Sequence, residues 1–391
     1  MSTHVLYGAN WCPDTARVRH WLGEHDVSYE WKNVDDGRDV VEEMLSRTNG
    51  EYLIPVFASD KAVLTNPSDA DLQELLGATD TPVVNYHDVV TIGAGPAALS
   101  AAIYTTREDI DTVLLEKGVV GGLAAITDVI ENYPGFEHGV DGMELSQNLR
   151  KQAERFGAKI ELAAVESVRD EGQYKKIETT SGTYAARTVL IATGSDYKRL
   201  NVPGESEFYG RGVHFCATCD GAFYRDKRLV VVGGGNSAAQ EGMFLTKFAS
   251  HIDMLVRGEQ LRASDVLAEK IQSSDQITIH YNTTTDEILH DGNQVTGVKG
   301  TNKQTGESLE LEADGVFVFI GLRPNTGFLH GSGIELDEQG FVITDRTLQS
   351  NVSGIFAAGD VRAGATQQIA SAVGEGATAA LMIREHLEHS G

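Results

Sequence analysis

The chain has 391 residues, 41% of them hydrophobic and 23% charged, and a formal net charge of −25 at pH 7. This length predicts about two to four domains, and the negative charge argues against binding to nucleic acid or to an anionic membrane. No apolar run approaches the ~20 residues of a membrane span and no secretory leader precedes the first cysteine, so we expect a cytoplasmic protein. Its three cysteines are too few for a disulfide scaffold.

The N-terminal part predicts a small α/β domain. A strand over 4–8 leads into a helix that opens at Pro13, and further strands and helices follow over 27–34, 39–47, 55–57, 62–64 and 69–76. Proline suits the first helical position because the amide proton it lacks would be unpaired there. Cys12 therefore stands at a helix N-terminus.

The run Trp11-Cys12-Pro13 and the later Ile54-Pro55 resemble the glutaredoxins, including the mycoredoxin-like group, over about the first 77 residues. Ile54-Pro55 stands in the place of that family's cis-proline. The second cysteine of the usual pair is Thr15, so Cys12 can act only as a monothiol. The alternative is a degenerate thioredoxin-like domain kept for packing or docking.

After this domain, a first dinucleotide site is predicted. The buried strand 89–92 runs into Gly93–Ala98, with the pattern G-x-G-x-x-A, and this run opens a helix. The first glycine makes the turn, the second lets the backbone approach a pyrophosphate, and the alanine permits close packing of helix on strand. A second strand ends at Glu116, where an acidic residue binds a ribose hydroxyl. We predict a dinucleotide site here rather than a glycine turn that binds nothing.

A second unit of the same kind follows a cysteine pair. The strand 229–232 enters Gly233–Ala239, again G-x-G-x-x-A. Cys216 and Cys219 lie one helical turn apart, close enough to form a disulfide, and a helix N-terminus there would favour a thiolate. The pair fits half of a metal site, two buried structural thiols or a redox dithiol. Because zinc needs four ligands and a second pair is absent, we favour the redox dithiol and expect no metal.

Two further features point to the identity of the dinucleotides. The strand 252–256 ends in Arg257, followed by Arg262, and cations at this place pair with the 2′-phosphate of NADPH. Ordinary surface charge is the alternative for these arginines. Near the C-terminus a strand ends in Gly359-Asp360 and a helix over 367–386 begins nearby, as in flavoproteins in which such an aspartate binds a ribityl hydroxyl.

From residue 87 to 391 these motifs and their order resemble the bacterial low-molecular-weight thioredoxin reductases. The resemblance implies an α/β fold with two Rossmann-like dinucleotide-binding domains behind a thioredoxin-like domain. The domains implied are a glutaredoxin-like domain (1–77), a linker (78–86), a discontinuous FAD domain (87–200 and 326–391) and an NAD(P)H domain with the cysteine pair (201–325).

The resemblance also implies cofactors and residue roles. Electrons pass from NADPH to FAD and then to the Cys216–Cys219 disulfide; Cys219 receives them, Cys216 attacks the substrate and Asp220 donates and accepts protons. The cofactor-binding residues that we expect are Gly93, Gly95, Pro96, Ala97, Glu116, Lys117, Gly122, Asn132, Ala192, Thr193, Gly194, Gly359, Asp360, Gln368 and Ile369 for FAD, and Gly233, Gly235, Asn236, Ser237, Ala238, Arg257 and Arg262 for NADPH.

At three places the chain departs from the family pattern. Leu123 stands where glutamine is usual, Gln367-Gln368-Ile369 replaces Arg-Gln-Ala, and the usual His-Arg-Arg becomes Val256-Arg257-Gly258. The first removes a polar contact near the flavin, and the other two each remove a cation.

The preferred hypothesis is a homodimeric flavoenzyme that reduces a thioredoxin-like protein or a low-molecular-weight disulfide, with Cys12 relaying electrons to mixed disulfides. A rival keeps thioredoxin as the substrate and makes the N-terminal domain passive. Others are a reductase that uses NADH, a reductase supplied by ferredoxin or a deazaflavin, and a flavin-bound redox sensor without turnover. Hydroperoxide-reductase flavoproteins also combine such modules, but their N-terminal part is larger and has a dithiol.

Overall fold

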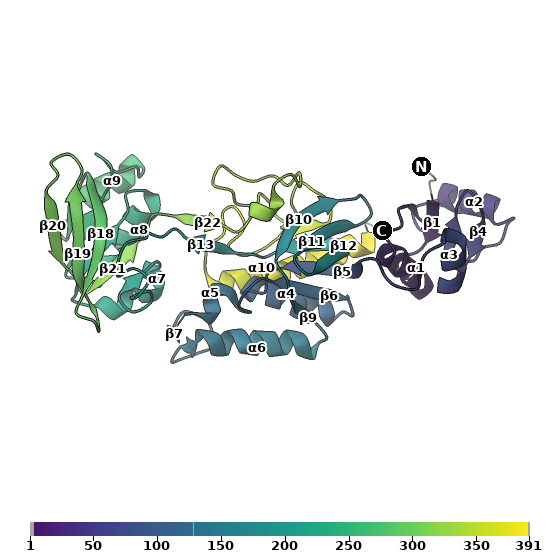
Figure 1. Cartoon of the computed structure of the whole chain (residues 1–391), viewed down its shortest axis with the longest axis horizontal. Coiled ribbons are helices and arrows are strands. Elements are labelled where there is room, and N and C mark those ends of the chain that lie inside the picture. Colours follow the sequence, from purple (N-terminus) through teal and green to yellow (C-terminus); the bar gives the residue numbers. More distant parts are fainter. Residues whose placement is uncertain (1–3, 128, 390–391) are drawn as a thin grey trace. The chain divides into compact units, whose positions relative to one another are not determined.

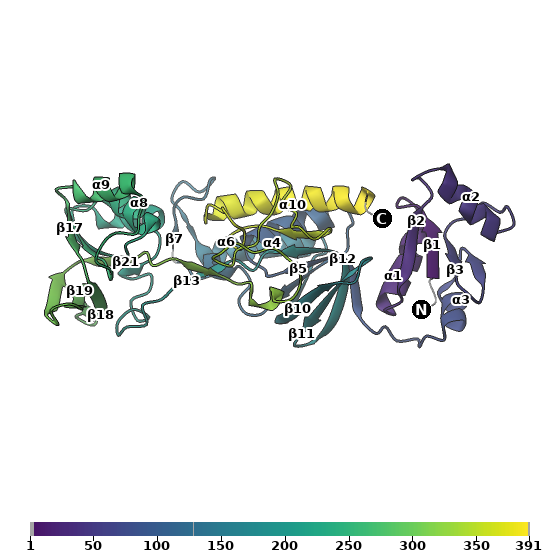
Figure 2. The same ribbon diagram turned by 90° about the horizontal axis from the view of Figure 1, so that it is seen from above.

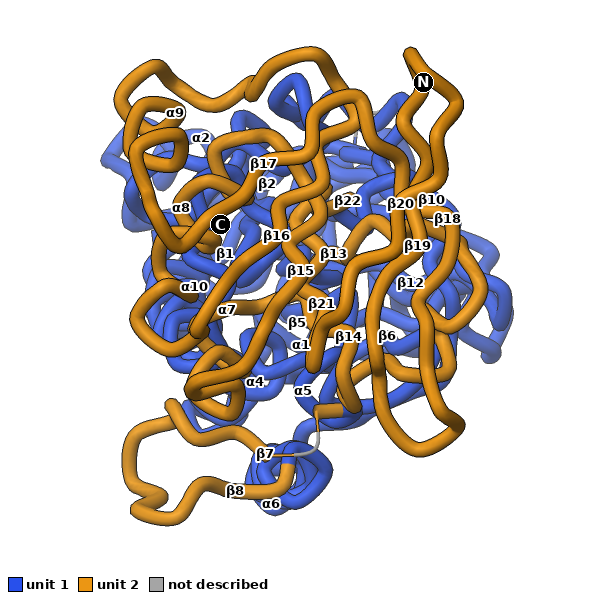
Figure 3. Tube along the Cα trace, turned by 90° about the vertical axis from the view of Figure 1, so that its left-hand side faces the viewer, with its two compact units in different colours: residues 1–126, 142–194, 324–391 blue, residues 127–141, 195–323 orange. Residues whose placement is uncertain are grey.

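The structure is a computed structural model (Figures 1 and 2) that describes residues 4–127 and 129–389. The chain divides into two compact units (Figure 3): unit 1 comprises residues 1–126, 142–194 and 324–391, and unit 2 comprises residues 127–141 and 195–323. Both units mix helices with sheets, so the predicted α/β fold class is confirmed.

The N-terminal part of unit 1 is a four-stranded sheet with helices on both faces. Its elements are β1 (His4–Gly8), α1 (Pro13–Glu24), β2 (Tyr29–Asn33), α2 (Arg38–Arg47), β3 (Val56–Ala58), β4 (Val63–Thr65) and α3 (Asp69–Leu76). The strand order is β2-β1-β3-β4. Helices α1 and α3 bury apolar side chains on one face, and α2 buries its own on the other. The predicted elements all occur here, in the predicted order.

The rest of unit 1 is one larger sheet with helices. Its elements are β5 (Asn85–Ile92), α4 (Pro96–Thr106), β6 (Thr112–Glu116), α5 (Gly122–Ala125), α6 (Gly142–Arg155), β9 (Lys159–Leu162), β10 (Val165–Asp170), β11 (Lys175–Thr179), β12 (Gly182–Ile191), η2 (Gly327–Leu329), β23 (Ile355–Ala357) and α10 (Ile369–His389).

This sheet has the order β10-β11-β12-β5-β6-β9, and β23 pairs with β12. Strands β23, β12, β5, β6 and β9 run parallel to one another, whereas β11 is antiparallel to β12. The carboxyl ends of the five parallel strands therefore meet at one edge, where ligands bind in open α/β sheets. Helices α4 and α10 lie side by side on one face (Figure 2).

Unit 2 has a second parallel sheet. Its elements are β7 (Val129–Ile130), β8 (Val140–Asp141), β13 (Ser195–Tyr197), β14 (Val213–His214), α7 (Ala217–Asp220), η1 (Gly221–Tyr224), β15 (Arg228–Val232), α8 (Asn236–Leu245), β16 (His251–Leu255), α9 (Asp265–Gln272), β17 (Ile277–His280), β18 (Thr283–His290), β19 (Val295–Asn302), β20 (Ser308–Glu312), β21 (Gly315–Val318) and β22 (Leu322–Pro324).

Five of these strands form the parallel sheet in the order β14-β21-β15-β16-β17. Helices α8 and α9 cover one face, and the antiparallel strands β18, β19 and β20 cover the other. Within the described residues of both units, no helix is long and apolar enough to cross a membrane.

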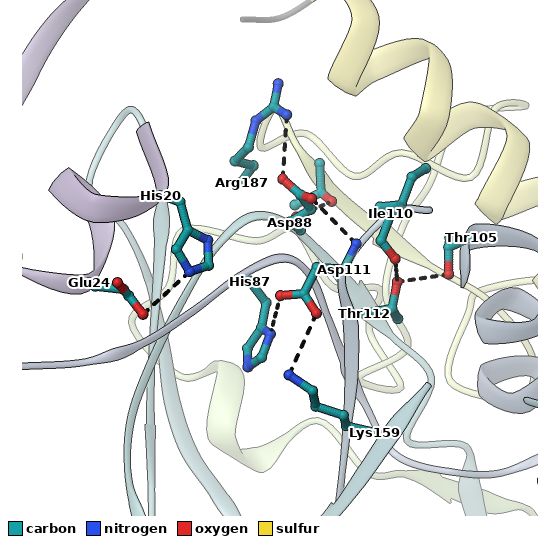
Figure 4. A network of polar contacts seen from close by, with 11 residues as sticks. His20, Glu24, His87, Asp88, Thr105, Ile110, Asp111, Thr112, Lys159 and Arg187 are labelled. Atoms are coloured by element: carbon teal, nitrogen blue, oxygen red, sulfur yellow. Dashed lines mark hydrogen bonds and ion pairs between the residues drawn. The ribbon is translucent and has the colours of Figure 1, made fainter. Parts of the chain in front are cut away.

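Strand β5 begins at Asn85, inside the stretch that we predicted as a linker. Tyr86 is buried, and its ring lies so close to Gly23 of α1 that an added Cβ would come within 2.2 Å of it. Beside it, His87 Nδ1 lies 2.7 Å from Asp111 Oδ2 (Figure 4). The N-terminal domain therefore packs at the amino-terminal end of β5.

Candidate functional site

The two cysteines of the predicted dithiol are joined in the structure. Cys216 and Cys219 form a disulfide whose Cα atoms lie 5.3 Å apart. Strand β14 ends two residues earlier, and Cys216 caps the short helix α7, where its sulfur accepts a hydrogen bond from the Cys219 amide at 3.2 Å. Both cysteines are half-buried. The sequence therefore places a disulfide at the first turn of a helix, as predicted.

Polar side chains surround this disulfide. Asp220 lies in the same helix, and its Oδ2 is 3.2 Å from Nδ1 of His214. The other ring nitrogen of His214 is 2.7 Å from the Tyr224 hydroxyl. On the neighbouring helix α8, Glu241 accepts a hydrogen bond from the Ala217 amide, and burial raises the pKa of its carboxyl group. The disulfide thus has two carboxyl groups and a histidine within one small cluster.

The third cysteine lies in the N-terminal domain. Cys12 caps α1, is not disulfide-bonded and is only 7% exposed, whereas the neighbouring Trp11 is 69% exposed. The Thr15 hydroxyl accepts a hydrogen bond from the Ala9 amide at 3.4 Å, so the position of the missing second cysteine is buried and bonded. The Ile54–Pro55 peptide bond is cis, as expected at this place.

The first glycine loop has the shape that a pyrophosphate requires. Gly93 has φ +99°, and an added Cβ would lie 2.6 Å from the Ala192 carbonyl oxygen, so only glycine fits. Gly95 caps α4, and a Cβ added to it would meet nothing within 4 Å. The open space in front of this helix N-terminus fits a dinucleotide phosphate. Gly122 lies across the same space, its added Cβ 3.7 Å from the Gly95 Cα.

Glu116 ends strand β6 beside this loop. Its carboxylate oxygens accept hydrogen bonds of 2.8 Å from the amides of Ala94 and Gly118. These bonds hold the carboxylate at the carboxyl edge of the sheet, where it is half-exposed. The next residue, Lys117, is exposed. The acid that we predicted at the ribose is therefore oriented by the backbone of the glycine loop itself.

The C-terminal helix meets the same loop. An added Cβ at Gly376 of α10 would lie 2.1 Å from the Ala97 carbonyl oxygen of α4, so the two helices touch through their backbones. Glu375 accepts a hydrogen bond from the Gly359 amide at 2.8 Å and pairs with Arg362 at 2.6 Å. Burial and the nearby Glu375 raise the pKa of Asp360 to about 6.

The remaining FAD residues divide between the units. Thr193 donates a hydrogen bond from its hydroxyl to the Asn325 carbonyl at 2.8 Å, and this contact fixes the turn that ends in Gly194. Gln368 and Ile369 lie at the start of α10. Asn132 belongs to the segment 127–141, which clusters with unit 2, so unit 1 does not by itself bring it to the glycine loop.

The second glycine loop repeats this architecture in unit 2. Gly233 has φ +147°, and its added Cβ would lie 2.4 Å from the Phe319 carbonyl oxygen, while Gly235 caps α8 in front of open space. The segment that carries the two arginines is tied to this loop: the Arg262 amide donates to the Gly234 carbonyl at 2.6 Å. The Ser264 amide donates to Asn236 Oδ1 at 2.8 Å.

Both arginines are exposed. Among the described residues, neither the Arg257 nor the Arg262 guanidinium forms an ion pair or a hydrogen bond. Ser237 is exposed at the helix start, and Ala238 is fully buried under it. The backbone contacts of Arg262 and Ser264 thus bring this segment to the start of α8, where exposed arginines could pair with a 2′-phosphate.

Sequence reasoning missed three side chains of the dithiol cluster: His214, Tyr224 and Glu241. They lie between 4 and 21 positions from Asp220 along the chain, so no short motif unites them. The one available signal in the sequence was His214, which stands two residues before the C-x-x-C pair and could have been predicted to lie near it.

The chain matches two protein families and has curated relatives of known activity. Residues 87–376 match the model of the pyridine nucleotide-disulphide oxidoreductases, and residues 4–61 match the glutaredoxin model. The chain is 41% identical over 302 residues to a thioredoxin reductase of Listeria innocua, covering 77% of this chain and 94% of that one. It is 42% identical over 302 residues to that of Bacillus subtilis, covering 77% and 95%.

Solved structures of thioredoxin reductases also resemble this chain. The thioredoxin reductase of Streptococcus pyogenes superposes with a TM-score of 0.74 at 38% identity, over 78% of this chain and 98% of that one. The thioredoxin reductase of Giardia duodenalis gives the same TM-score at 34% identity, over 77% and 98%.

Proposed function

The chain belongs to the pyridine nucleotide-disulphide oxidoreductase family, among the thioredoxin reductases, with a glutaredoxin domain ahead of them, and from this we propose how its own residues work. The enzyme is a disulfide reductase that uses FAD and NADPH. When bound, the two cofactors supply an electron pair to the Cys216–Cys219 disulfide. The alternatives without a nicotinamide donor or without turnover are not favoured by these relatives.

The disulfide at the start of α7 carries the proposal. Reduction of this disulfide gives two thiols. Cys216 attacks one sulfur of the substrate disulfide, and the first substrate thiolate leaves; Cys219 then attacks Cys216, closes the internal disulfide and releases the second thiolate. The two protons of the dithiol end on the two product thiols. We assign Asp220, in the same helix, the transfer of a proton between these sulfurs.

Two sets of residues would hold the cofactors. We assign FAD to unit 1, where Gly95 and Gly122 border open space that would hold the phosphates and Glu116 would bind a ribose hydroxyl. NADPH is assigned to the loop Gly233–Ala238 of unit 2. The supporting observation is the same in both: a glycine at the helix start with open space in front of it.

Removing the two arginines should weaken NADPH binding selectively. In Arg257→Ala and Arg262→Ala we expect the KM for NADPH to rise about tenfold per charge-assisted bond, with NADH little affected. The measurement is anaerobic titration of the protein with NADPH and with NADH, following flavin absorbance, and then steady-state turnover on thioredoxin. Lys227→Ala, which removes an exposed cation at the opposite end of β15, is the matched control.

This experiment also tests the proposed function. Prompt bleaching of the flavin by NADPH and oxidation of NADPH on addition of thioredoxin support it. Absence of bleaching by either nucleotide would contradict it, and equal use of both nucleotides by the unmodified protein would contradict the role of the arginines.

We propose that a thioredoxin-type protein is the substrate of the dithiol and that Cys12 passes electrons on to mixed disulfides. The second part rests on the position of the Cys12 sulfur at the start of α1, next to the exposed Trp11. A thiolate at a helix N-terminus is stabilised and nucleophilic.

Cys12→Ser should therefore lose activity on small mixed disulfides. We expect the NADPH-dependent rate on a glutathionylated peptide to fall about a hundredfold, because serine is a poor nucleophile at neutral pH. Turnover on thioredoxin, measured in the same preparations, is the internal reference. Unchanged rates on every disulfide would show that the N-terminal domain is passive.

Further expectations concern assembly and environment. We propose that the enzyme works as a homodimer in the cytoplasm and binds neither nucleic acid nor membranes. The net charge of −25 supports the last two points, since both of those surfaces are anionic.

A further inference from the structure

The ring of His214 connects two groups beside the dithiol. Its Nδ1 lies 3.2 Å from Asp220 Oδ2, and its Nε2 lies 2.7 Å from the Tyr224 hydroxyl. All three residues belong to unit 2, on β14, α7 and η1. The carboxyl group to which we assigned proton transfer is thus one end of a chain of three hydrogen-bonding groups.

Packing holds this ring in one orientation. His214 is 7% exposed and stacks on Phe317 of β21, with ring centroids 5.2 Å apart. The Tyr224 ring in turn lies against Gly315, where an added Cβ would come within 2.4 Å of it. Because the ring is almost fully buried, water has little access to its two nitrogens, and the contacts with Asp220 and Tyr224 satisfy them.

The chain of groups accommodates Asp220 in both of its protonation states. When the carboxylate is ionised, it accepts the Nδ1 proton, and Nε2 accepts the hydroxyl proton of Tyr224. When the carboxyl is protonated, it donates to Nδ1, and Nε2–H donates to the tyrosine oxygen. Burial raises the pKa of Tyr224 to about 12, so its hydroxyl keeps its proton at neutral pH and serves as donor or acceptor.

We propose that His214 is a positioning residue of the reaction: its ring, anchored by Tyr224, fixes the Asp220 carboxyl beside the Cys216–Cys219 pair. This inference rests on the proposed role of Asp220. The ring itself contacts neither the substrate nor the sulfurs that exchange electrons. Its effect is on the rate at which Asp220 protonates the departing sulfur, and not on the affinity for thioredoxin.

Four variants test this role. His214→Phe keeps the ring on Phe317 but removes both nitrogens, and His214→Asn places an amide near the former Nδ1. Tyr224→Phe removes only the outer hydroxyl. The control is His251→Phe, which removes another histidine–aspartate contact of unit 2, the 3.7 Å approach of His251 to Asp253.

Two measurements are made on the flavin-loaded protein. The first is kcat and KM for NADPH-dependent reduction of thioredoxin. The second is a single turnover without nucleotide: protein reduced with dithiothreitol and freed of it is mixed with the aromatic disulfide 5,5′-dithiobis(2-nitrobenzoate), and release of the coloured thiolate is followed. The second assay isolates the dithiol from the nucleotide sites.

For His214→Phe we expect kcat with thioredoxin to fall about tenfold with KM within about twofold. For His214→Asn we expect a kcat within about threefold of that of the unmodified protein, because its amide still donates to Asp220. The kcat of Tyr224→Phe should lie between those of His214→Phe and His214→Asn. The kcat of His251→Phe should equal that of the unmodified protein.

The outcomes are decisive in each case. Equal kcat for His214→Phe and His251→Phe, or a His214→Asn variant as slow as His214→Phe, would overturn the inference. If His214→Phe does not fold, the other two variants still test the inference. A kcat near that of the unmodified protein for His214→Asn, together with a lower kcat for Tyr224→Phe, would support it. Equal kcat values for these two variants would overturn it. An unmodified protein that fails in the single turnover contradicts the proposed function instead.

Discussion

Cys219→Ser is expected to abolish disulfide reduction while leaving the nucleotide sites intact. The substitution removes one sulfur of the Cys216–Cys219 bond, so no internal disulfide can accept electrons or close again. We expect the rate on thioredoxin to fall by a factor of about 10⁴ or more, as for loss of an activated nucleophile. Reduction of the flavin by NADPH should persist, since neither glycine loop is altered.

The matched control for this variant is Thr218→Ser. Thr218 lies between the two cysteines and is exposed, so the substitution alters the same turn without touching a sulfur. Stopped-flow absorbance and a thioredoxin-coupled assay give the two rates. Substantial thioredoxin reduction by Cys219→Ser would mean that a different disulfide of the chain or of a partner receives the electrons.

Gly376→Ala should lose both stability and flavin. The new Cβ would lie 2.1 Å from the Ala97 carbonyl oxygen, and because that oxygen belongs to backbone, α10 and α4 must move apart. Overpacking of this kind costs about 3 kcal/mol of unfolding free energy. Helix α4 begins at the first glycine loop, so its displacement should also lower the flavin content of the purified protein.

The same substitution two residues earlier provides the control. A Cβ at Gly374 would meet nothing within 4 Å, so Gly374→Ala should gain up to about 1 kcal/mol from the higher helix propensity of alanine. Thermal melting and the ratio of flavin to protein absorbance distinguish the pair. Equal melting temperatures and equal flavin contents would show that the two helices separate without cost.

The glycine loops could be predicted from sequence because their function imposes a local pattern. Gly93 and Gly233 stand where a side chain would strike a carbonyl oxygen, and each is followed by a helix in the predicted place. Strand, turn, helix and terminal acid are all neighbours along the chain. Such features depend on few residues, and a single sequence contains them.

Other features depend on contacts between distant residues. The pair Thr193 and Asn325 and the contact of Gly376 with Ala97 join segments more than 100 residues apart. The hairpin of β10 and β11 was not predicted, since its strands are half-exposed and lack a continuous apolar run. The burial of Tyr86 was not predicted because it depends on helix α1, more than 60 residues earlier in the chain, where the ring packs on Gly23 and edge-on against His20.

The attachment of the N-terminal domain at Tyr86 explains how a protein of this family can acquire an extra module. The N-terminal domain lies at the amino-terminal end of strand β5, and the first glycine loop follows its carboxyl-terminal end. The eight residues of the strand separate the two by about 25 Å. A gene fusion at the start of this strand lengthens the chain without inserting a residue into the first dinucleotide loop. Domain recombination at this position therefore leaves that loop's inherited geometry untouched.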